Sequence, residues 1–220
     1  MDVACGTGLV ASRISPTSGA WCQVTGLDIN EGMLEVARQI EGIEWVHGDA
    51  TDLPFPDGSF DAVLFQQGLQ YIPDRAGAMK QMARVLAPRG RLSVAVWGAL
   101  ERQPFYVALK AGLAAYLPEQ KDAYALAFSL NTAEELRALA TDAGLRDVRV
   151  RFEHRTIRYP DLKAFIGGFM QGTMISAAFM ALPEGRRVAF VDHVAGLLGG
   201  YVDDGGMALP LENHFLTARR

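Results

Sequence analysis

The sequence predicts an α/β fold with a doubly wound, mostly parallel β-sheet that carries helices on both faces. Short apolar stretches that suit strands alternate along the chain with amphipathic stretches that suit helices, a pattern typical of such sheets. The first apolar stretch ends in a glycine turn, Asp2-Val3-Ala4-Cys5-Gly6-Thr7-Gly8, and helical character follows from about Leu9 to Ile14. A strand–turn–helix unit of this kind aims free backbone N–H groups at a ligand, and its glycines let that ligand approach the main chain.

Length, charge and cysteine content limit the classes of function. With 220 residues and half of them hydrophobic, the chain is long enough for one domain with a full core. A net charge of −4 without a basic run disfavours nucleic acid and anionic membrane surfaces as partners. Cys5 and Cys22 give neither a disulfide framework nor a metal-ligand spacing. No signal peptide is recognisable, and no apolar run reaches the roughly 18 residues of a membrane span, so we expect a cytoplasmic protein without a membrane anchor or a metal.

The elements of the first hundred residues follow the alternation. Asn30 is expected to cap a helix that carries Met33 and Leu34 on its apolar side, and Asp74–Leu86 reads as an amphipathic helix. Pro88-Arg89-Gly90 is expected to form a turn. Strands are predicted at Gln23–Asp28, Ile43–His47, Phe60–Gln66 (buried on both faces) and Arg91–Trp97.

The second half of the chain is richer in helix. Residues 98–130 show helical character and no strand, and Asn131 or Thr132 begins a further helix whose early glutamates favour the helix dipole. A strand is predicted at Val148–Ile157, then a long helical insertion at Tyr159–Asp204, then a final strand at Glu212–Thr217.

Three aspartates stand at the ends of three successive predicted strands: Asp2, Asp28 and Asp49. The carboxyl ends of strands in a doubly wound sheet form its ligand crevice. Asp28 lies 20 residues beyond Gly8, where a carboxylate commonly holds two ribose hydroxyls. Each aspartate alone is as well explained by helix capping, but the three together fit a nucleoside with a positively charged tail.

These motifs resemble class I S-adenosylmethionine-dependent methyltransferases, most of all the small-molecule branch that includes the ubiquinone and menaquinone biosynthesis enzymes. The matching stretches cover most of residues 1–158 and the last strand. They are Asp2-x-x-x-Gly6-x-Gly8, Asp28, Gly48-Asp49-Ala50, Asp52-Leu53-Pro54-Phe55, Phe60-Asp61-Ala62-Val63, Gln66-Gln67-Gly68-Leu69-Gln70-Tyr71 and Arg84-Val85-Leu86-Ala87-Pro88-Arg89-Gly90.

The resemblance implies a Rossmann-like sheet of seven strands with an antiparallel last strand, and it implies S-adenosylmethionine as cofactor. By position, the turn with Asp2, Ala4, Gly6, Thr7 and Gly8 would hold the methionine moiety. Asp28 would bind the ribose, Ile29 and Met33 would lie beside the adenine, and Asp49 and Ala50 would contact it. Gln66 would lie near the methyl group, with Gln70 and Tyr71 as further candidates at the reaction centre.

One departure from the family concerns the start of the chain. Family members carry a complete first strand, usually with a helix or two before it, whereas only Met1–Ala4 precede the turn here. Loss of a central strand would leave buried backbone groups unpaired at roughly 1–3 kcal/mol each. We therefore expect either that the native chain extends upstream of Met1 or that the gene is truncated, which the intact mass of the native protein would decide.

A methyltransferase needs little acid–base chemistry because the methyl group leaves an already activated sulfonium. We expect a methyltransferase core at residues 1–158 and 208–220, and a helical substrate cover at 99–130 and 159–207 that favours a small hydrophobic or aromatic substrate. The histidines His154, His193 and His214 are better explained as structural or surface residues than as bases. The sequence does not define the oligomeric state.

Two alternatives stay open at this point. Gly6-x-Gly8-x-x-Ala11 also satisfies the dinucleotide-binding fingerprint of an NAD(P)-dependent oxidoreductase. In such an enzyme Asp28 would be the acidic residue that binds the ribose hydroxyls. Asp2 opposes that interpretation because it would place negative charge beside a pyrophosphate. The other alternative is a truncated, methyltransferase-like chain without activity.

Overall fold

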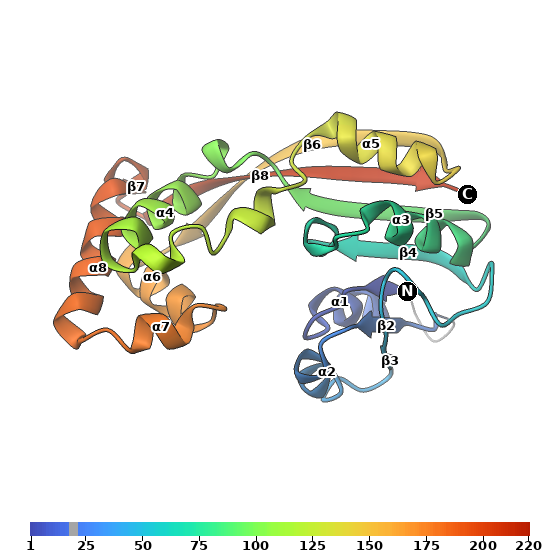
Figure 1. The fold of residues 1–220 in the computed structure, drawn as a ribbon, viewed down its shortest axis with the longest axis horizontal. Helices are drawn as coiled ribbons and strands as arrows, with labels where there is room; N and C mark the ends of the chain where they lie inside the picture. The colour runs from blue at the N-terminus through green and yellow to red at the C-terminus, as the bar shows by residue number, and fades with distance from the viewer. Residues whose placement is uncertain (18–21) are drawn as a thin grey trace. The chain divides into compact units, whose positions relative to one another are not determined.

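The computed structural model describes residues 1–17 and 22–220, which form two compact units (Figure 1). Unit 1 comprises Met1–Trp97, Ser129–Phe152 and Asn213–Arg220. Unit 2 comprises Gly98–Phe128 and Glu153–Glu212. Each unit has its own cluster of buried hydrophobic side chains.

Unit 1 is built on a mostly parallel sheet in the order β3-β2-β1-β4-β5-β8-β6. Strands β3, β2, β1, β4 and β5 pair in parallel along this order, while β8 pairs with β5 in the antiparallel sense. The predicted fold class, including the antiparallel last strand, is therefore confirmed. The strands are β1 (Asp2–Val3), β2 (Thr25–Asp28), β3 (Glu44–His47), β4 (Phe60–Gln66), β5 (Leu86–Trp97), β6 (Arg146–Tyr159) and β8 (Gly206–Arg219), of which β6 and β8 continue into unit 2.

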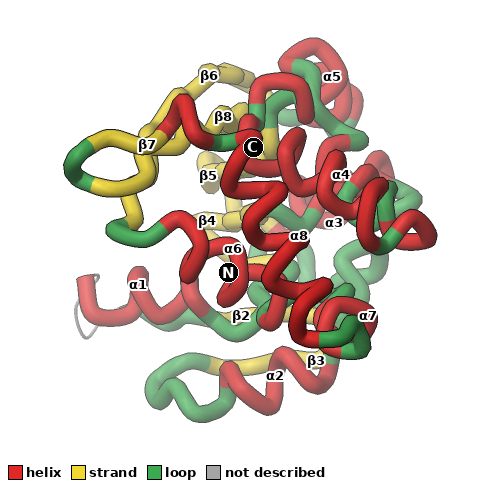
Figure 2. Tube along the Cα trace, turned by 90° about the vertical axis from the view of Figure 1, so that its left-hand side faces the viewer, coloured by secondary structure: helices red, strands yellow, loops and turns green. Residues whose placement is uncertain are grey.

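Helices lie on both sides of this sheet. Figure 2 shows α3 (Arg75–Val85) and α5 (Ala133–Asp142) on one side and α1 (Leu9–Thr17) on the other, with α2 (Glu31–Ala37) beside the β3 edge. The predicted caps are present: the side chain of Asn30 accepts from the backbone N–H of Met33, and that of Thr132 accepts from Glu135. Because these side chains satisfy backbone donors that the helix leaves free, they define where α2 and α5 begin.

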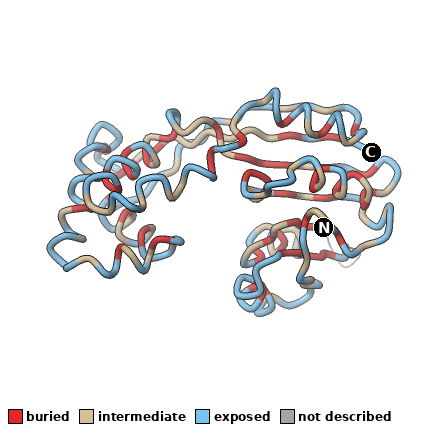
Figure 3. Tube along the Cα trace, in the orientation of Figure 1, coloured by how far each residue is buried: buried red, intermediate tan, exposed pale blue. Residues whose placement is uncertain are grey.

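The core of unit 1 lies between α3, α5 and one face of the sheet, where the buried segments concentrate (Figure 3). Residues Ala78, Met79 and Met82 of α3 are fully buried in the same cluster as Val63 and Phe65 of β4. Their spacing is that of a single helix face, as the sequence pattern predicted. Burial of such side chains supplies most of the favourable free energy that orders the sheet.

Strands β4 and β5 differ from expectation. Only Val63 and Phe65 of β4 are buried, and Asp61 and Ala62 are exposed, so the prediction of a strand buried on both faces was wrong. The two residues of the neighbouring β1 pair with Leu64 and Phe65 of β4.

The predicted turn at Pro88-Arg89-Gly90 lies within the bounds of β5, which begins at Leu86 and not at Arg91. Phe60 of β4 pairs with Leu86 of β5, and the next pair is Ala62 with Arg91. Between these two pairs the chain moves on by two residues in β4 and by five residues in β5. Arg89 has a left-handed φ of 67°, and a bulge of this kind takes up the extra residues without ending the strand.

Unit 2 is a helical bundle with a hairpin. Its helices are α4 (Pro104–Tyr116), α6 (Leu162–Gln171), α7 (Ser176–Met180) and α8 (Glu184–Leu197). The two-residue strand β7 (Val202–Asp203) pairs with β8, whose start at Gly206 lies six residues before the predicted Glu212. The sheet thus has eight strands where seven were expected. Among the described residues, no helix combines the length and the apolarity that a bilayer crossing needs.

Candidate functional site

A cavity of about 720 Å³ opens in unit 1 at the carboxyl ends of β1, β2, β3 and β4. This is the crevice where doubly wound sheets bind ligands. Eight of the residues predicted for the site line it: Ala4, Gly6, Asp28, Ile29, Met33, Asp49, Ala50 and Tyr71. The rest of the described lining consists of residues that the sequence analysis did not single out for the site: Leu27, Asn30, Gly48, Thr51, Gln67, Gly68, Ile72, Pro73 and Asp74.

The carboxylate of Asp28 fixes the geometry where β2 ends. One oxygen accepts from the backbone N–H of Gly6 at 2.7 Å, and the other accepts from the backbone N–H of Asn30 at 2.8 Å. Asp28 is 8% exposed, so both bonds form in a partly desolvated site and are strengthened by the charge. Asp28 therefore joins the glycine turn after β1 to the start of α2. A carboxylate has about four acceptor positions, so about two remain for hydroxyl donors of a ligand.

The glycine turn leaves space beside the cavity at one position. Gly6 has a left-handed φ of 55°, and a Cβ built there would meet no protein atom within 4 Å. Ala4 adopts a similar φ of 52°, which costs a non-glycine residue about 1–2 kcal/mol. Strain of this kind is tolerated where the surrounding structure holds it, and it concentrates at ligand sites.

Asp2 and Gly8 belong to the turn but do not line the cavity. Asp2 is 1% exposed and accepts from the backbone N–H of Ala11 at 3.1 Å, so it fastens the end of β1 to helix α1. Burial raises its pKa from 3.8 to about 6. Gly8 packs against Trp45, whose ring would lie 2.5 Å from an added Cβ. Thr7 lies between the two glycines and is likewise outside the lining.

Asp49 forms the β3 side of the cavity. Its Oδ1 accepts from the backbone N–H and from the hydroxyl of Thr51, both at 2.8 Å. These two bonds lower the pKa of the Asp49 carboxyl below its ordinary value, the backbone bond most. Asp28, Asp49 and Asp74 are the charged residues of the described lining, so its formal charge is entirely negative. An acidic lining attracts a cationic ligand and disfavours a pyrophosphate.

Amide side chains gather after β4. Gln67 lines the cavity and has a left-handed φ of 54°. Its side-chain amide nitrogen donates to Oδ1 of Asn213 at 2.8 Å, and its Oε1 accepts from the side-chain nitrogen of Gln70 at 3.0 Å. Gln70 is fully buried, and its Oε1 has no hydrogen-bond partner among the described residues. Of the residues predicted for the reaction centre, Gln66 is exposed at the end of β4 and, like Gln70, lies outside the lining.

Tyr71 carries the phenolic hydroxyl of the described cavity lining, in which the Thr51 hydroxyl is already bonded to Asp49. Tyr71 is 41% exposed, and burial of the ring raises the pKa of the phenol above its ordinary value. Tyr71 therefore keeps its proton in neutral solution and offers a hydrogen-bond donor. Two of the histidines lie elsewhere: His214 contacts the carbonyl of Asn131 at 2.9 Å, and His193 packs beside Tyr116 in unit 2.

Sequence reasoning could have found part of the unassigned lining. Gly68 follows the strand end directly, and a Cβ there would lie 2.3 Å from Phe65 and 2.8 Å from Ala4, a close approach that only glycine allows. The contact between Gln67 and Asn213 joins residues 146 positions apart, so no local pattern indicates it.

Comparisons with known proteins agree with this geometry. A family described as "Methyltransferase domain" matches residues 1–94. A demethylmenaquinone methyltransferase of Staphylococcus epidermidis is 49% identical over 94 residues, which are 41% of this chain and 39% of that protein. A demethylmenaquinone methyltransferase of Staphylococcus aureus is 36% identical over 171 residues, 69% of each chain. The chain thus spans well under half of the S. epidermidis relative and about two thirds of the S. aureus one.

Solved structures share the fold at low sequence identity. The YcgJ protein of Bacillus subtilis has a TM-score of 0.62 and 20% identity, covering 100% of this chain and 90% of that one. A phosphoethanolamine N-methyltransferase of Haemonchus contortus, in complex with S-adenosyl-L-methionine, has a TM-score of 0.61 and 19% identity, covering 100% and 47%. The [4+2]-cyclase SpnF has a TM-score of 0.57 and 23% identity, covering 100% and 73%. At these identities the likeness concerns the fold alone.

Proposed function

The chain belongs to the class I S-adenosylmethionine-dependent methyltransferase family, of the menaquinone and ubiquinone type, and we propose that it methylates a small hydrophobic or aromatic molecule. The observation that carries this proposal is the acidic cavity at the strand ends, with Asp28 held in place by the amides of Gly6 and Asn30.

The residues present fit the family's cofactor. The acceptor positions that remain on Asp28 suit the two ribose hydroxyls, and the exposed side chains of Ile29 and Met33 offer an apolar surface to an adenine. Asp49, already oriented by Thr51, would accept from the adenine amino group beside Ala50. The open space at Gly6 would receive the methionine moiety, and Asp2 would act as a positioning residue that fixes this turn to α1.

The bound cofactor supplies an activated methyl group on a positively charged sulfur. The chain then has to align the acceptor with that methyl group, at a distance of about 3–3.5 Å between reacting atoms, and exclude water. The acidic lining would stabilise the positive charge, and the protonated Tyr71 would donate a hydrogen bond to an acceptor oxygen or nitrogen. Gln66 and Gln70 remain candidates for orienting the acceptor from the end of β4.

The relatives named demethylmenaquinone methyltransferases support an aromatic acceptor of quinone type. The segments 99–130 and 159–207, proposed as the substrate cover, carry a cluster rich in Phe and Met that includes Phe105, Phe165 and Phe169. Methyl transfer from labelled S-adenosylmethionine to a panel of hydroxyquinones, naphthols and aromatic amines tests the proposal directly.

Calorimetric titration with S-adenosylhomocysteine and, separately, with NADH distinguishes the alternatives. Saturable binding of the first ligand alone supports the proposal. Binding of NADH alone would favour the oxidoreductase, and binding of neither by a folded chain would favour a methyltransferase-like protein without activity.

A further inference from the structure

Beside the acidic cavity, three amide side chains form a continuous row of hydrogen bonds. The side-chain nitrogen of Gln70 donates to Oε1 of Gln67 at 3.0 Å, and the side-chain nitrogen of Gln67 donates to Oδ1 of Asn213 at 2.8 Å. We call Gln70, Gln67 and Asn213 the amide row. Gln67, its middle member, is the one that lines the cavity. Bonds in such a row polarise one another, so the remaining donor and acceptor positions of Gln67 are strengthened.

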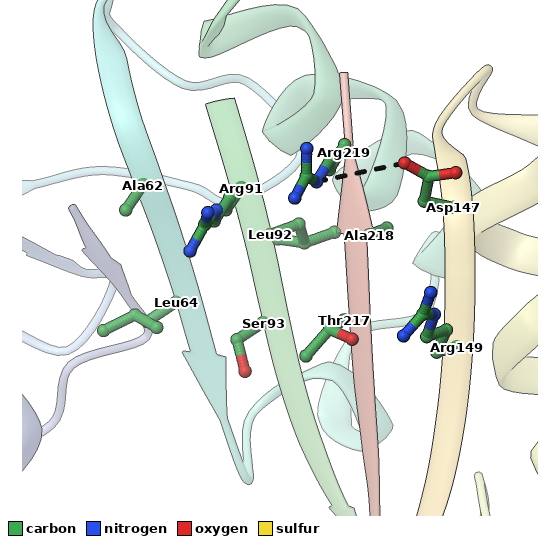
Figure 4. A pocket seen from close by; sticks show the side chains of 10 residues that line it. All are labelled: Ala62, Leu64, Arg91, Leu92, Ser93, Asp147, Arg149, Thr217, Ala218 and Arg219. Carbon is green, nitrogen blue, oxygen red and sulfur yellow. Dashed lines mark ion pairs between the residues drawn. The ribbon is translucent and has the colours of Figure 1, made fainter. Parts of the chain in front are cut away.

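Strands β5 and β8 hold one end of the amide row. Figure 4 shows Ser93 of β5 beside Thr217 of β8, and the same ladder continues to Asn213, four residues earlier on β8. The backbone N–H of Gln67 donates to the carbonyl of Ala95 on β5 at 2.8 Å. The backbone and the side chain of Gln67 are therefore fastened to two neighbouring strands, which fixes where its amide lies.

Burial holds the other end of the amide row. Gln70 is fully buried, and its Oε1 has no hydrogen-bond partner among the described residues. A buried polar atom without a partner destabilises a folded protein, and a leucine of similar size would avoid that cost. The hydrogen bond to Gln67 is what a leucine could not provide. An amide at position 70 is therefore explained better by the orientation of Gln67 than by the stability of the loop.

The backbone of Gln67 is strained. Its φ of 54° lies in the left-handed region, which glycine and asparagine adopt more readily than glutamine. Strain of this kind concentrates at ligand sites, where the surrounding structure holds it. Together with the amide row, it indicates that the side chain at position 67 serves a ligand.

Few polar side chains of the cavity lining remain for a methyl acceptor. The hydroxyl of Thr51 is bonded to Asp49, and the side chains that cap α2 and α3 accept from backbone N–H groups. Asp28 and Asp49 are the contacts proposed for the nucleoside. Within the described lining, this leaves Gln67 and Tyr71. A glutamine amide offers two N–H groups and two lone pairs, so Gln67 keeps one of each beyond the amide row.

The charge of the lining determines the form in which an acceptor binds. The described lining contains acidic residues and no lysine, arginine or histidine. An anionic acceptor is therefore repelled, whereas a neutral hydroxyl is not. A neutral hydroxyl both donates and accepts, which matches the positions that remain on an amide oxygen and on a phenol.

We propose, on the basis of the methyl transfer proposed above, that Oε1 of Gln67 accepts a hydrogen bond from a neutral phenolic hydroxyl of the methyl acceptor. Gln70 and Asn213 are then positioning residues, because they act on the acceptor through Gln67. Tyr71 would donate to the oxygen of the same hydroxyl. The acceptor class that follows is a hydroxylated aromatic molecule bound in its neutral form.

The probes are 2-naphthol and 2-methoxynaphthalene, which differ in whether the oxygen carries a hydrogen to donate. Each is titrated through its own fluorescence at neutral pH with the full chain saturated with S-adenosylhomocysteine. The parent chain should bind 2-naphthol about three- to tenfold more tightly than the ether, as expected for one neutral hydrogen bond.

Two variants test the roles in the amide row. Gln67→Asn keeps an amide and suits the left-handed backbone, but its side chain is one methylene shorter. Gln70→Leu removes the bond that orients Gln67. In both variants the preference for 2-naphthol over the ether should disappear. The matched control is Gln39→Asn, the same change at an exposed position after α2 and outside the lining, which should keep the preference.

Urea unfolding separates a positioning role of Gln70 from a structural one. Gln70→Leu should leave the unfolding midpoint unchanged or raise it, because it removes the buried oxygen without a partner. A lower midpoint combined with an unchanged preference for 2-naphthol would show that the amide serves the fold, and would overturn the positioning role.

Titration with S-adenosylhomocysteine separates this proposal from that of methyl transfer. Its affinity should be the same in the parent, Gln67→Asn and Gln70→Leu. A loss of this affinity in Gln67→Asn as large as the loss for 2-naphthol would assign Gln67 to the cofactor and overturn the proposal. A parent that binds S-adenosylhomocysteine but does not prefer 2-naphthol would also overturn it and leave methyl transfer standing. A parent that does not bind S-adenosylhomocysteine would overturn both.

Discussion

Replacement of Gly6 by alanine separates cofactor binding from folding. The left-handed φ of 55° at Gly6 costs an alanine about 1–2 kcal/mol, a small part of a typical stability of about 5–15 kcal/mol. No protein atom lies within 4 Å of the added Cβ, so no steric clash adds to this cost. The new methyl group would instead occupy space beside the cavity that we assign to the methionine moiety. The affinity for S-adenosylhomocysteine should therefore fall at least tenfold, or about 1.4 kcal/mol.

Gly144→Ala is the matched control for Gly6→Ala. Gly144 has a φ of 80°, has no atom within 4 Å of a built Cβ, and lies after α5, outside the cavity lining. Both variants should lose similar stability in urea unfolding, but only Gly6→Ala should lose affinity in calorimetric titration. Unchanged affinity in Gly6→Ala, or an equal loss in Gly144→Ala, would refute the placement of the cofactor beside Gly6.

Three further predictions concern Asp28, Asp2 and Gly26. Asp28→Asn turns an amide N–H towards a backbone N–H donor, so the free energy of unfolding measured in urea should fall by about 1–3 kcal/mol. The affinity for S-adenosylhomocysteine should fall more than tenfold. Unchanged affinity would contradict the assignment of Asp28 to the ribose. The pKa of Asp2 is raised from 3.8 to about 6 in the folded chain, so stability should fall by about 3 kcal/mol as the pH rises across that range. Asp2→Asn should lack this fall in pH-dependent unfolding, and an identical pH profile would contradict the burial argument. Gly26→Ala should destabilise the chain by about 1–3 kcal/mol, because its Cβ would lie 2.4 Å from the Trp45 ring; an unfolding midpoint like that of the parent would contradict this packing.

Local signals in the sequence predicted much of the fold. The cap at Asn30 depends on a side chain and a backbone donor three residues apart, so it is visible in a short window. The buried face of α3 follows from its helical spacing, and the alternation of strands and helices indicates the sheet class. The cavity at the strand ends follows from that class, which is why Asp28 and Asp49 could be placed in advance.

Other features depend on contacts between distant segments. Strand β8 begins as early as Gly206 because β7 pairs with its first residues. Strand β7 lies in the segment Tyr159–Asp204, which the sequence pattern predicted to be helical. The bulge that keeps Arg89 inside β5 depends on the register with β4. The left-handed backbone of Gln67 and its contact with Asn213 are tertiary effects that propensity does not indicate. The role of Gln70 as a buried residue, outside the cavity lining, belongs to the same class.

Calorimetric titration of S-adenosylhomocysteine into the chain tests the central claim most directly, because it measures cofactor binding without knowledge of the methyl acceptor. The account predicts saturable binding in the micromolar range, lost in Gly6→Ala and kept in Gly144→Ala. A cooperatively folded chain that does not bind S-adenosylhomocysteine would contradict it.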